Sequence, residues 1–265
     1  MTIRTALAQG TELLKGDRLN AEVLLAHAMR SDRTYFYAHP EQELTELQWI
    51  HYGRYLHERR GGKPTQYITG KQEFYSREFR VTPDVLIPRP ETELLVEAVL
   101  KRRQNGRAAD VGTGSGAIAI TLSLESKLEV IATDISLPAL KLAGTLGCRR
   151  VSFIQSDLLT AIADQSLDVV VSNPPYVAET DRATLQPEVR DWEPHLALFA
   201  GPDGLDVYRR LIPDANRVLK PGGLLALEIG FGQADSVSTL CEGWRSLEVL
   251  PDLAGIPRVI VCEKP

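Results

Sequence analysis

Apolar residues in roughly the first 60 positions recur every three or four residues, which is the spacing of one face of an α-helix. Thr45 and Gln48 form the pattern of a capping box, in which a hydroxyl and a carboxamide three residues apart close the first turn of a helix. That helix is expected to end near Gly61 and Gly62, because glycine commonly follows the last turn. The pattern predicts a small bundle of helices in residues 1–70.

The spacing changes after residue 70. Residues 72–81 alternate like a β-hairpin, and prolines at positions 83, 88 and 90 stiffen the chain that follows. We therefore expect residues 71–90 to be a hairpin and a linker, followed by an amphipathic helix over residues 91–103.

Beyond residue 108, short apolar runs rich in branched side chains alternate with helical stretches. The runs expected to be strands are 109–111, 128–133, 151–154, 167–172 and 224–229, with a terminal pair near 249–250 and 258–261. Strands that alternate with helices form parallel sheets covered on both faces. The sequence predicts an α/β fold, with a doubly wound sheet in residues 91–265 and the small helical bundle as a separate N-terminal domain.

One apolar run stops at Asn173-Pro174-Pro175-Tyr176. Proline has no N–H to donate, and it holds the residue before it in an extended conformation. The Asn173 carboxamide and the Pro174 carbonyl are thus expected to be rigid acceptors at the carboxyl end of a strand, where open α/β sheets bind ligands. Two acceptors suit a planar NH2 group, and Tyr176 can pack on a flat amide or base. The alternative is a proline-rich turn with a capping asparagine.

A glycine-rich loop follows the first strand of the sheet, and it consists of Gly112, Thr113, Gly114, Ser115 and Gly116. Such a loop between a strand and a helix lets a ligand approach the backbone closely. Asp134 ends the next strand, where a carboxylate can accept hydrogen bonds from ribose hydroxyls. The same spacing satisfies the dinucleotide fingerprint, so a nicotinamide enzyme is an alternative, although no histidine or lysine is evident for hydride transfer.

Asp157 and Leu158 follow the third strand and form a third candidate contact. The carboxylate could accept a hydrogen bond from an adenine amine, with Leu158 against the ring. The alternative is that Asp157 caps the N-terminus of a helix.

Composition narrows the classes of function. The 265 residues, 43% hydrophobic and 25% charged, are ordinary for a soluble globular protein. No apolar run approaches the roughly 18 residues of a membrane span, and the first residues lack a signal-peptide core. Three scattered cysteines and five scattered histidines predict reduced thiols, no metal site and a cytoplasmic location. The net charge of −5 argues against a large nucleic-acid footprint.

These motifs together resemble the peptide chain release factor N5-glutamine methyltransferase family, a branch of the class I S-adenosylmethionine-dependent methyltransferases. The stretches that carry the resemblance span most of the chain. They are Pro64-x-Gln66-Tyr67-Ile68-x-Gly70, Glu73-Phe74, Pro88-Arg89-Pro90-Glu91-Thr92-Glu93, Asp110 to Gly116, Asn173 to Tyr176, Glu193-Pro194, Gly204-Leu205, Glu228-Ile229-Gly230 and Asp252-x-x-Gly255-x-x-Arg258. Asn-Pro-Pro-Tyr alone marks many amino-group methyltransferases, whereas the Pro-Arg-Pro-Glu segment after a small helical domain is far more specific.

The resemblance implies a Rossmann-like enzyme that methylates the glutamine of the Gly-Gly-Gln motif in release factors, using S-adenosyl-L-methionine. Residues 112–116 and Asp134 would bind the cofactor, and Asp157, Leu158 and Asn173 are further candidates. Asn173 through Tyr176 would hold the glutamine, with Asn173, Pro174 and Tyr176 acting in catalysis. One departure is Leu158, which stands where several members of the family place an aromatic residue beside the adenine.

The resemblance also implies partners. The helical domain of residues 1–70 would dock the release factor, and we expect no stable nucleic-acid partner, no membrane association and a monomer. Glu91 and Thr92 either line the amino-acid end of the cofactor or simply begin a helix, whose N-terminus favours acidic charge. Catalysis would rest on positioning and polarisation of the amide rather than on a strong base.

Two other classes of function stay open from the sequence. A nucleic-acid adenine methyltransferase uses the same four-residue grip, but it should bring a basic face and a target-recognition domain. A non-catalytic cofactor-binding or translation-associated module is the other alternative, and an intact Asn173-Pro174-Pro175-Tyr176 argues against it.

Overall fold

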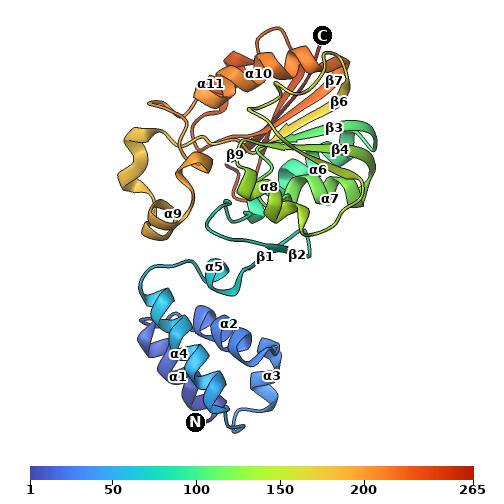
Figure 1. Cartoon of the computed structure of the whole chain (residues 1–265). Coiled ribbons are helices and arrows are strands. Elements are labelled where there is room, and N and C mark those ends of the chain that lie inside the picture. The colour runs from blue at the N-terminus through green and yellow to red at the C-terminus, as the bar shows by residue number, and fades with distance from the viewer. The chain divides into compact units, whose positions relative to one another are not determined.

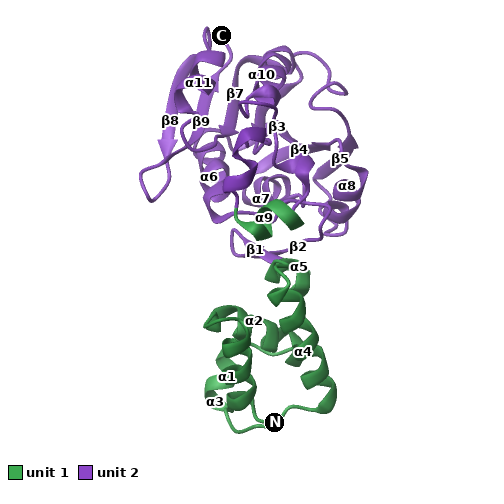
Figure 2. Cartoon of the chain, turned by 90° about the vertical axis from the view of Figure 1, so that its left-hand side faces the viewer, with its two compact units in different colours: residues 1–71, 186–192 green, residues 72–185, 193–265 purple.

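The computed structural model describes residues 1–265 and divides the chain into two compact units (Figure 2). Unit 1 comprises residues 1–71 and 186–192, and unit 2 comprises residues 72–185 and 193–265. Unit 1 is therefore built from two stretches that are far apart in the sequence.

The helices of unit 1 confirm the predicted bundle. They are α1 (Ile3–Leu13), α2 (Arg18–Met29), α3 (Arg33–Ala38), α4 (Glu46–Arg60), α5 (Thr65–Thr69) and the later α9 (Pro187–Trp192). The apolar faces of α1, α2 and α4 meet in one core around Leu24, Leu25 and Leu56. The predicted capping box opens α4, because the Thr45 hydroxyl accepts from Gln48 N while Gln48 Oε1 accepts from Thr45 N.

Helix α9 is fixed to the end of α4 within unit 1. Arg59 Nη1 lies 2.7 Å from Glu188 Oε2, and the two side chains are only 19% and 35% exposed. An ion pair shielded in this way is screened less by water than an open surface pair. Gly62 has a φ of +93°, and the Trp192 indole nitrogen lies 3.4 Å from where a side chain would begin there. The left-handed backbone favours glycine here, while Trp192 lies at ordinary van der Waals distance.

The hairpin predicted in residues 72–81 consists of β1 (Lys71–Phe74) and β2 (Arg77–Arg80). Its turn residues Tyr75 and Ser76 have φ values of 52° and 56°, as expected of a two-residue hairpin turn. The Tyr75 amide donates to Glu93 Oε1 at 2.7 Å. This bond ties the turn to the first residue of α6 (Glu93–Arg102).

A seven-stranded sheet forms the centre of unit 2 (Figure 1). Its strands are β3 (Asn105–Val111), β4 (Lys127–Asp134), β5 (Val151–Gln155), β6 (Leu167–Ser172), β7 (Leu219–Glu228), β8 (Arg245–Pro251) and β9 (Pro257–Glu263). Their order is β5-β4-β3-β6-β7-β9-β8, and the neighbours are parallel except at β9, which runs antiparallel to β7 and β8. The predicted doubly wound α/β fold is confirmed.

Helices cover both faces of this sheet, as Figure 1 shows. They are α6, α7 (Ala117–Glu125), α8 (Leu137–Gly144), α10 (Asp206–Val218) and α11 (Ala234–Leu240). Three short 3-10 helices lie in the connections, namely η1 (Pro90–Thr92), η2 (Glu179–Thr184) and η3 (His195–Ala197). Alternate residues of β6 face opposite layers, because side chains alternate along a strand. Val169 and Val171 pack in the core with α6 and α7, whereas Val170 packs in the core with α10 and α11. No helix combines the length and apolar character needed to cross a membrane.

The strand order reverses between β3 and β6. From β3 the chain builds outward through β4 to β5, and it then returns to place β6 on the other side of β3. Ligands of open α/β sheets bind in the crevice at this reversal, beyond the carboxyl ends of the strands. The glycine loop and Asn173 follow the two strands that flank it.

One hydroxyl in the core of unit 1 has no hydrogen-bond partner. Tyr52 is 0% exposed, and its hydroxyl is buried and unpaired. A Cβ on Gly10 would lie 1.9 Å from that hydroxyl. The tyrosine therefore occupies the space that the glycine of α1 leaves open.

We expect Tyr52→Phe to raise the free energy of unfolding by about 1 kcal/mol, because it removes a buried polar atom that bonds to nothing. Gly10→Ala should lower it by about 1–3 kcal/mol, because the new methyl group would collide with the ring. Urea unfolding followed by tryptophan fluorescence measures both. A clear loss of stability in Tyr52→Phe would contradict the unpaired hydroxyl.

Candidate functional site

The glycine loop and the Asn-Pro-Pro-Tyr segment leave the sheet side by side. Strands β3 and β6 are parallel, and Val111 is paired with Ser172 at the end of their register. The Ser172 hydroxyl donates to the Val111 carbonyl at 2.7 Å and joins the two strand ends. Gly112 and Asn173 are the next residues along each strand, so the pairing brings two motifs that lie some distance apart in the sequence to one edge.

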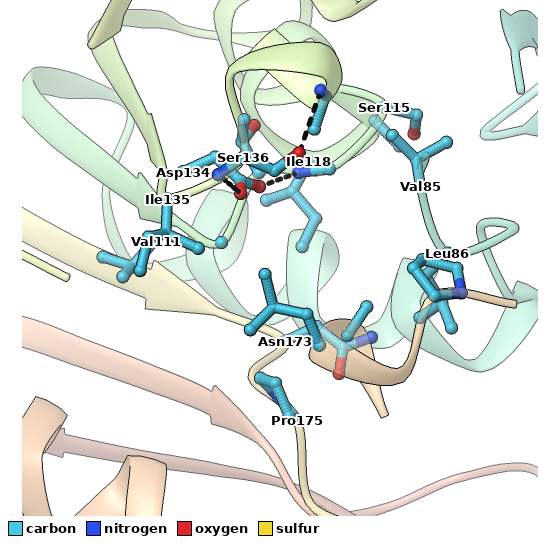
Figure 3. Close-up of a pocket in the computed structure, with 18 of the residues that line it drawn as sticks. Val85, Leu86, Val111, Ser115, Ile118, Asp134, Ile135, Ser136, Asn173 and Pro175 are labelled. Carbon is cyan, nitrogen blue, oxygen red and sulfur yellow. Dashed lines mark hydrogen bonds between the residues drawn. The ribbon is translucent and has the colours of Figure 1, made fainter. Parts of the chain in front are cut away.

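A cleft of about 260 Å³ opens at this edge within unit 2 (Figure 3). Small-molecule sites commonly measure roughly 300–1,000 Å³, and this cleft lies just below that range. In Figure 3, Asp134, Ile135 and Ser136 lie on one side of it, Val85 and Leu86 on another, and Asn173 and Pro175 at its base. The predicted site residues that line it are Gly112, Thr113, Gly114, Ser115, Asp134, Asp157, Leu158, Asn173 and Pro175.

The glycines of the loop divide into two kinds. All three have positive φ, 71° at Gly112, 54° at Gly114 and 81° at Gly116, and other residues rarely adopt that conformation. A Cβ on Gly112 or Gly114 would meet no atom within 4 Å, whereas one on Gly116 would lie 3.0 Å from Ala143 Cβ. Gly112 and Gly114 thus leave open space for a ligand, while Gly116, which does not line the cleft, lets α7 pack against α8.

Asp134 organises the loop from the neighbouring strand. Its Oδ2 accepts from Gly114 N at 2.8 Å and its Oδ1 accepts from Ser136 N at 2.8 Å (Figure 3). Burial raises the pKa of Asp134 above its ordinary value, although these N–H groups oppose the shift. Each carboxylate oxygen has a further lone pair, so Asp134 can still accept from a ligand in the cleft.

Asp110 supports the same loop from beneath and does not line the cleft. It is 0% exposed, and its Oδ2 accepts from the Thr113 hydroxyl at 2.6 Å and from Ala119 N at 3.0 Å. Its Oδ1 is buried without a partner. Burial raises the pKa of Asp110 to about 7. Asp110 therefore joins the loop to the first turn of α7, a structural role that the motif alone did not specify.

Asp157 and Leu158 line the cleft. The alternative, in which Asp157 caps the N-terminus of a helix, requires a helix at this position. Residues 158–161 form turns and no helix follows before β6, so Asp157 does not cap a helix. Leu158 has a φ of 50°, unusual for a leucine. Asp157 Oδ2 lies 2.5 Å from Arg210 Nη2, and both side chains are about half exposed at 47% and 58%. Asp157 is thus more open to water than Asp134.

Asn173 is held by residues from two other segments. Its Nδ2 donates to the Thr92 hydroxyl at 3.1 Å, and Thr92 donates to Glu228 Oε2 at 2.7 Å. Neither Asn173 Oδ1 nor the Pro174 carbonyl accepts a hydrogen bond from the protein. Asn173 lines the cleft, so its Oδ1 is available to an NH2 group there, whereas Pro174 is buried and does not line the cleft. Thr92 lines the cleft, whereas Glu91 is exposed and does not.

Tyr176 does not line the cleft, and it is packed into the protein. Gln233 Nε2 donates to its carbonyl at 3.0 Å, and Gly204 and Gly230 flank it closely. A Cβ on Gly204 would lie 2.3 Å from the Tyr176 carbonyl, and one on Gly230 would lie 2.9 Å from the ring. Burial raises the pKa of Tyr176 to about 12. The tyrosine and the two glycine motifs thus fix the chain that follows the buried Pro174.

Sequence analysis missed a second set of residues, which comes from the linker. Residues 84–88 were expected only to connect domains, yet Val85, Leu86 and Pro88 line the cleft. Glu193 holds this segment, because it accepts from Ile87 N at 3.2 Å and forms an ion pair with Arg89. The repeated prolines around Arg89 were the available signal, since they indicate a fixed rather than a flexible segment.

The two kinds of glycine should respond differently to substitution. We expect Gly114→Ala to cost about 1–3 kcal/mol of unfolding free energy through its left-handed backbone. Gly116→Ala should cost about 1–3 kcal/mol more, because its methyl group would also press on Ala143. Urea unfolding of both variants provides the comparison, and equal losses would contradict the packing role of Gly116.

Two known families match consecutive parts of the chain. The PrmC N-terminal domain matches residues 5–70, and the Methyltransferase small domain matches residues 90–189. Among solved structures, the 16S rRNA N2 G1207 methyltransferase of T. thermophilus has a TM-score of 0.56 at 20% identity, covering 74% of this chain and 50% of that chain. This likeness is one of fold.

Curated proteins match nearly the whole chain. The release factor glutamine methyltransferase of Koribacter versatilis is 48% identical over 256 residues, which cover 94% of this chain and 91% of that protein. That of Moorella thermoacetica is 44% identical over 275 residues, with 97% of both chains covered. The matches cover more than nine-tenths of this chain and of each relative, and on this ground the chain belongs to the release factor glutamine methyltransferase family.

Proposed function

We propose that this protein transfers a methyl group from S-adenosyl-L-methionine to the side-chain amide nitrogen of the glutamine in the Gly-Gly-Gln motif of release factors. The observation that carries the proposal is Asn173, which lines a small-molecule cleft and whose Oδ1 has no donor in the protein, with the unbonded Pro174 carbonyl next to it along the chain. The names of the relatives support the same substrate. Methylation at that glutamine would modulate translation termination.

The residues of the cleft fit this cofactor. Gly112 and Gly114 leave room above the loop, and Asp134 offers a carboxylate to ribose hydroxyls. Leu158 supplies an apolar surface on which a base could rest, with Asp157 as a further acceptor. When bound, S-adenosylmethionine supplies a methyl group on a positively charged sulfur, which departs as a neutral thioether.

The protein's own groups would act on the glutamine. The lone pair of an amide nitrogen is delocalised into the carbonyl, so this nitrogen is a weak nucleophile. Asn173 Oδ1 and the Pro174 carbonyl would accept its two N–H groups, which directs the lone pair into the cleft and stabilises positive charge as the new N–C bond forms. One of these protons then passes to water. No strong base is required, because the methylated nitrogen is acidic before it loses the proton.

We also propose that unit 1 docks the release factor. A single glutamine loop offers little buried area, so affinity must come from a surface away from the cleft. The adenine methyltransferase alternative shares the acceptor pair, but a net charge of −5 gives it little support.

The acceptor pair is tested by offering labelled cofactor with either a release factor or duplex DNA. We expect label only on the release factor, with mass spectrometry placing it on the Gly-Gly-Gln glutamine. Asn173→Ala should lower the single-turnover rate by about 10²–10³, as when one preorganised contact to a transition state is lost. Asn173→Asp keeps an acceptor but adds charge near the sulfonium, so cofactor affinity should hold or rise while the rate falls. Near-normal rates in both variants would remove Asn173 from the site.

The cofactor role of Asp134 is tested against Asp157. Asp134→Ala should weaken S-adenosylmethionine binding by about 1.5–3 kcal/mol, the usual contribution of hydrogen bonds to a charged group. Asp157→Ala should cost less than about 1 kcal/mol, because its carboxylate is half exposed and already paired with Arg210. Calorimetry measures both affinities, and urea unfolding checks that the loop remains folded. Equal losses in the two variants would contradict this assignment.

A further inference from the structure

A chain of hydrogen bonds runs from the base of the cleft into the core of unit 2. It begins at Asn173 Nδ2, passes through the Thr92 hydroxyl at 3.1 Å and ends on Glu228 Oε2 at 2.7 Å. The three residues come from the end of β6, the start of α6 and the end of β7. Thr92 is 4% exposed and Glu228 is 1% exposed, so water does not compete for these bonds.

The protons in this chain determine which way the Asn173 carboxamide faces. An ionised carboxylate can only accept, so Thr92 must give its single hydroxyl proton to Glu228. The Thr92 oxygen can then only accept from Asn173, which requires the NH2 end of the carboxamide. Asn173 Oδ1 is consequently left for the substrate. The reversed carboxamide would present an NH2 group to the glutamine NH2, and two donors cannot bond.

We propose that Thr92 and Glu228 are positioning residues that set the orientation of the Asn173 carboxamide for methyl transfer. The inference rests on the proposed function of Asn173. Neither residue touches the reacting atoms in this account, and both act through the asparagine.

Two observations argue against a purely structural role. Thr92 precedes α6 in the position of a helix cap, yet its side chain makes no capping hydrogen bond. Glu228 is a buried carboxylate with no ion-pair partner, because Arg89 pairs with Glu193 and Arg258 pairs with Asp252. A buried unpaired charge opposes folding, so its presence indicates a role that an apolar residue could not fill.

Protonation of Glu228 should reverse the chain. Burial raises the pKa of Glu228 to about 7, and the Thr92 hydrogen bond opposes the shift. The neutral acid could donate to Thr92, whose own proton would then seek Asn173 Oδ1 and turn the carboxamide round. The charged and titratable groups that face Glu228 are Arg258, Glu91 and Arg89, together with Tyr176 and Tyr208. Only Glu228 is joined to Asn173 through Thr92.

A double-mutant cycle on the full-length enzyme tests the proposal with single-turnover methylation of a release factor. Thr92→Val should lower the rate by about tenfold or more, since a misplaced group can cost up to 10²-fold. Thr92→Ser keeps the hydroxyl and should stay within about threefold of the wild type. In the Asn173→Ala background, Thr92→Val should lower the rate no further, because the two residues act as one unit.

The matched control is Thr121→Val, which makes the same change at a threonine that is also buried, in α7, with an unpaired hydroxyl. It should leave the rate unchanged. Two results would overturn the positioning role. One is that Thr92→Val lowers the rate by the same factor in the wild type and in Asn173→Ala, and the other is a wild-type rate in Thr92→Val. Should Thr92→Val fail to fold, Glu228→Gln takes its place in the cycle. A wild-type rate in Asn173→Ala would refute the proposed role of Asn173, on which this inference rests, and a lack of methylation by the wild-type enzyme would refute the proposed function, so the failures are distinguishable.

The pH profile gives a second, independent readout. The wild-type rate should fall as pH is lowered from about 8 to 6, since ionised Glu228 is the working form and is lost below its pKa. Glu228→Gln cannot titrate, so its rate should be flat over this range. Asp110 has a pKa of about 7 as well. Because Asp110 is unchanged in Glu228→Gln, a fall in rate caused by Asp110 would persist in that variant. If the rate of Glu228→Gln still falls as pH is lowered from about 8 to 6, another group causes that fall, and the proposed reversal of the hydrogen-bond chain is wrong.

Discussion

Strand β3 pairs in parallel with β6, and the end of that register joins Val111 to Ser172. The two motifs at the carboxyl edge of the sheet depend on this pairing. It sets the first residue of the glycine loop beside Asn173, the residue proposed to hold the substrate, and the Ser172 hydroxyl holds the two strand ends together. Because the strands are buried on both faces by separate helical layers, a shift of one residue would turn the alternating valines of β6 into the wrong layers. The packing of the core and the position of the site are thus fixed by the same register.

The sequence predicted those parts of the fold and the site that depend on local pattern. Helical spacing and the capping box at Thr45 predicted the bundle, and the alternation of strands with helices predicted the doubly wound sheet. The placement of Asn173 and of the loop from Gly112 at one edge of the sheet followed from residue chemistry at strand ends, and their roles stay predictions. Each of these inferences uses residues that are close together in the sequence, so their spacing alone is informative.

The remaining features depend on contacts between distant residues. The Glu228 side chain reaches Thr92 across more than a hundred residues, and Glu193 reaches Arg89 in the same way. Gly204 and Gly230 are required because Tyr176 lies against them, which no local pattern could indicate. The stretches that contain these residues were among those that carry the family resemblance, but no physical reason for their presence was evident from the sequence. The structure supplies one, since each stretch either orients Asn173 or fixes the chain on either side of the cleft.

The discontinuity of unit 1 has a mechanical consequence. The chain passes between the units at three places, after residues 71, 185 and 192, rather than through one tether. Two of those crossings bound α9, which the Arg59–Glu188 ion pair holds to α4. One end of this short helix leads back to Tyr176, and the other continues directly into Glu193. Two bodies joined by one connection can rotate freely about it, whereas three connections restrict that rotation. One end of α9 thus continues from the Asn-Pro-Pro-Tyr segment, and the other leads into the residue that holds the linker beside the cleft.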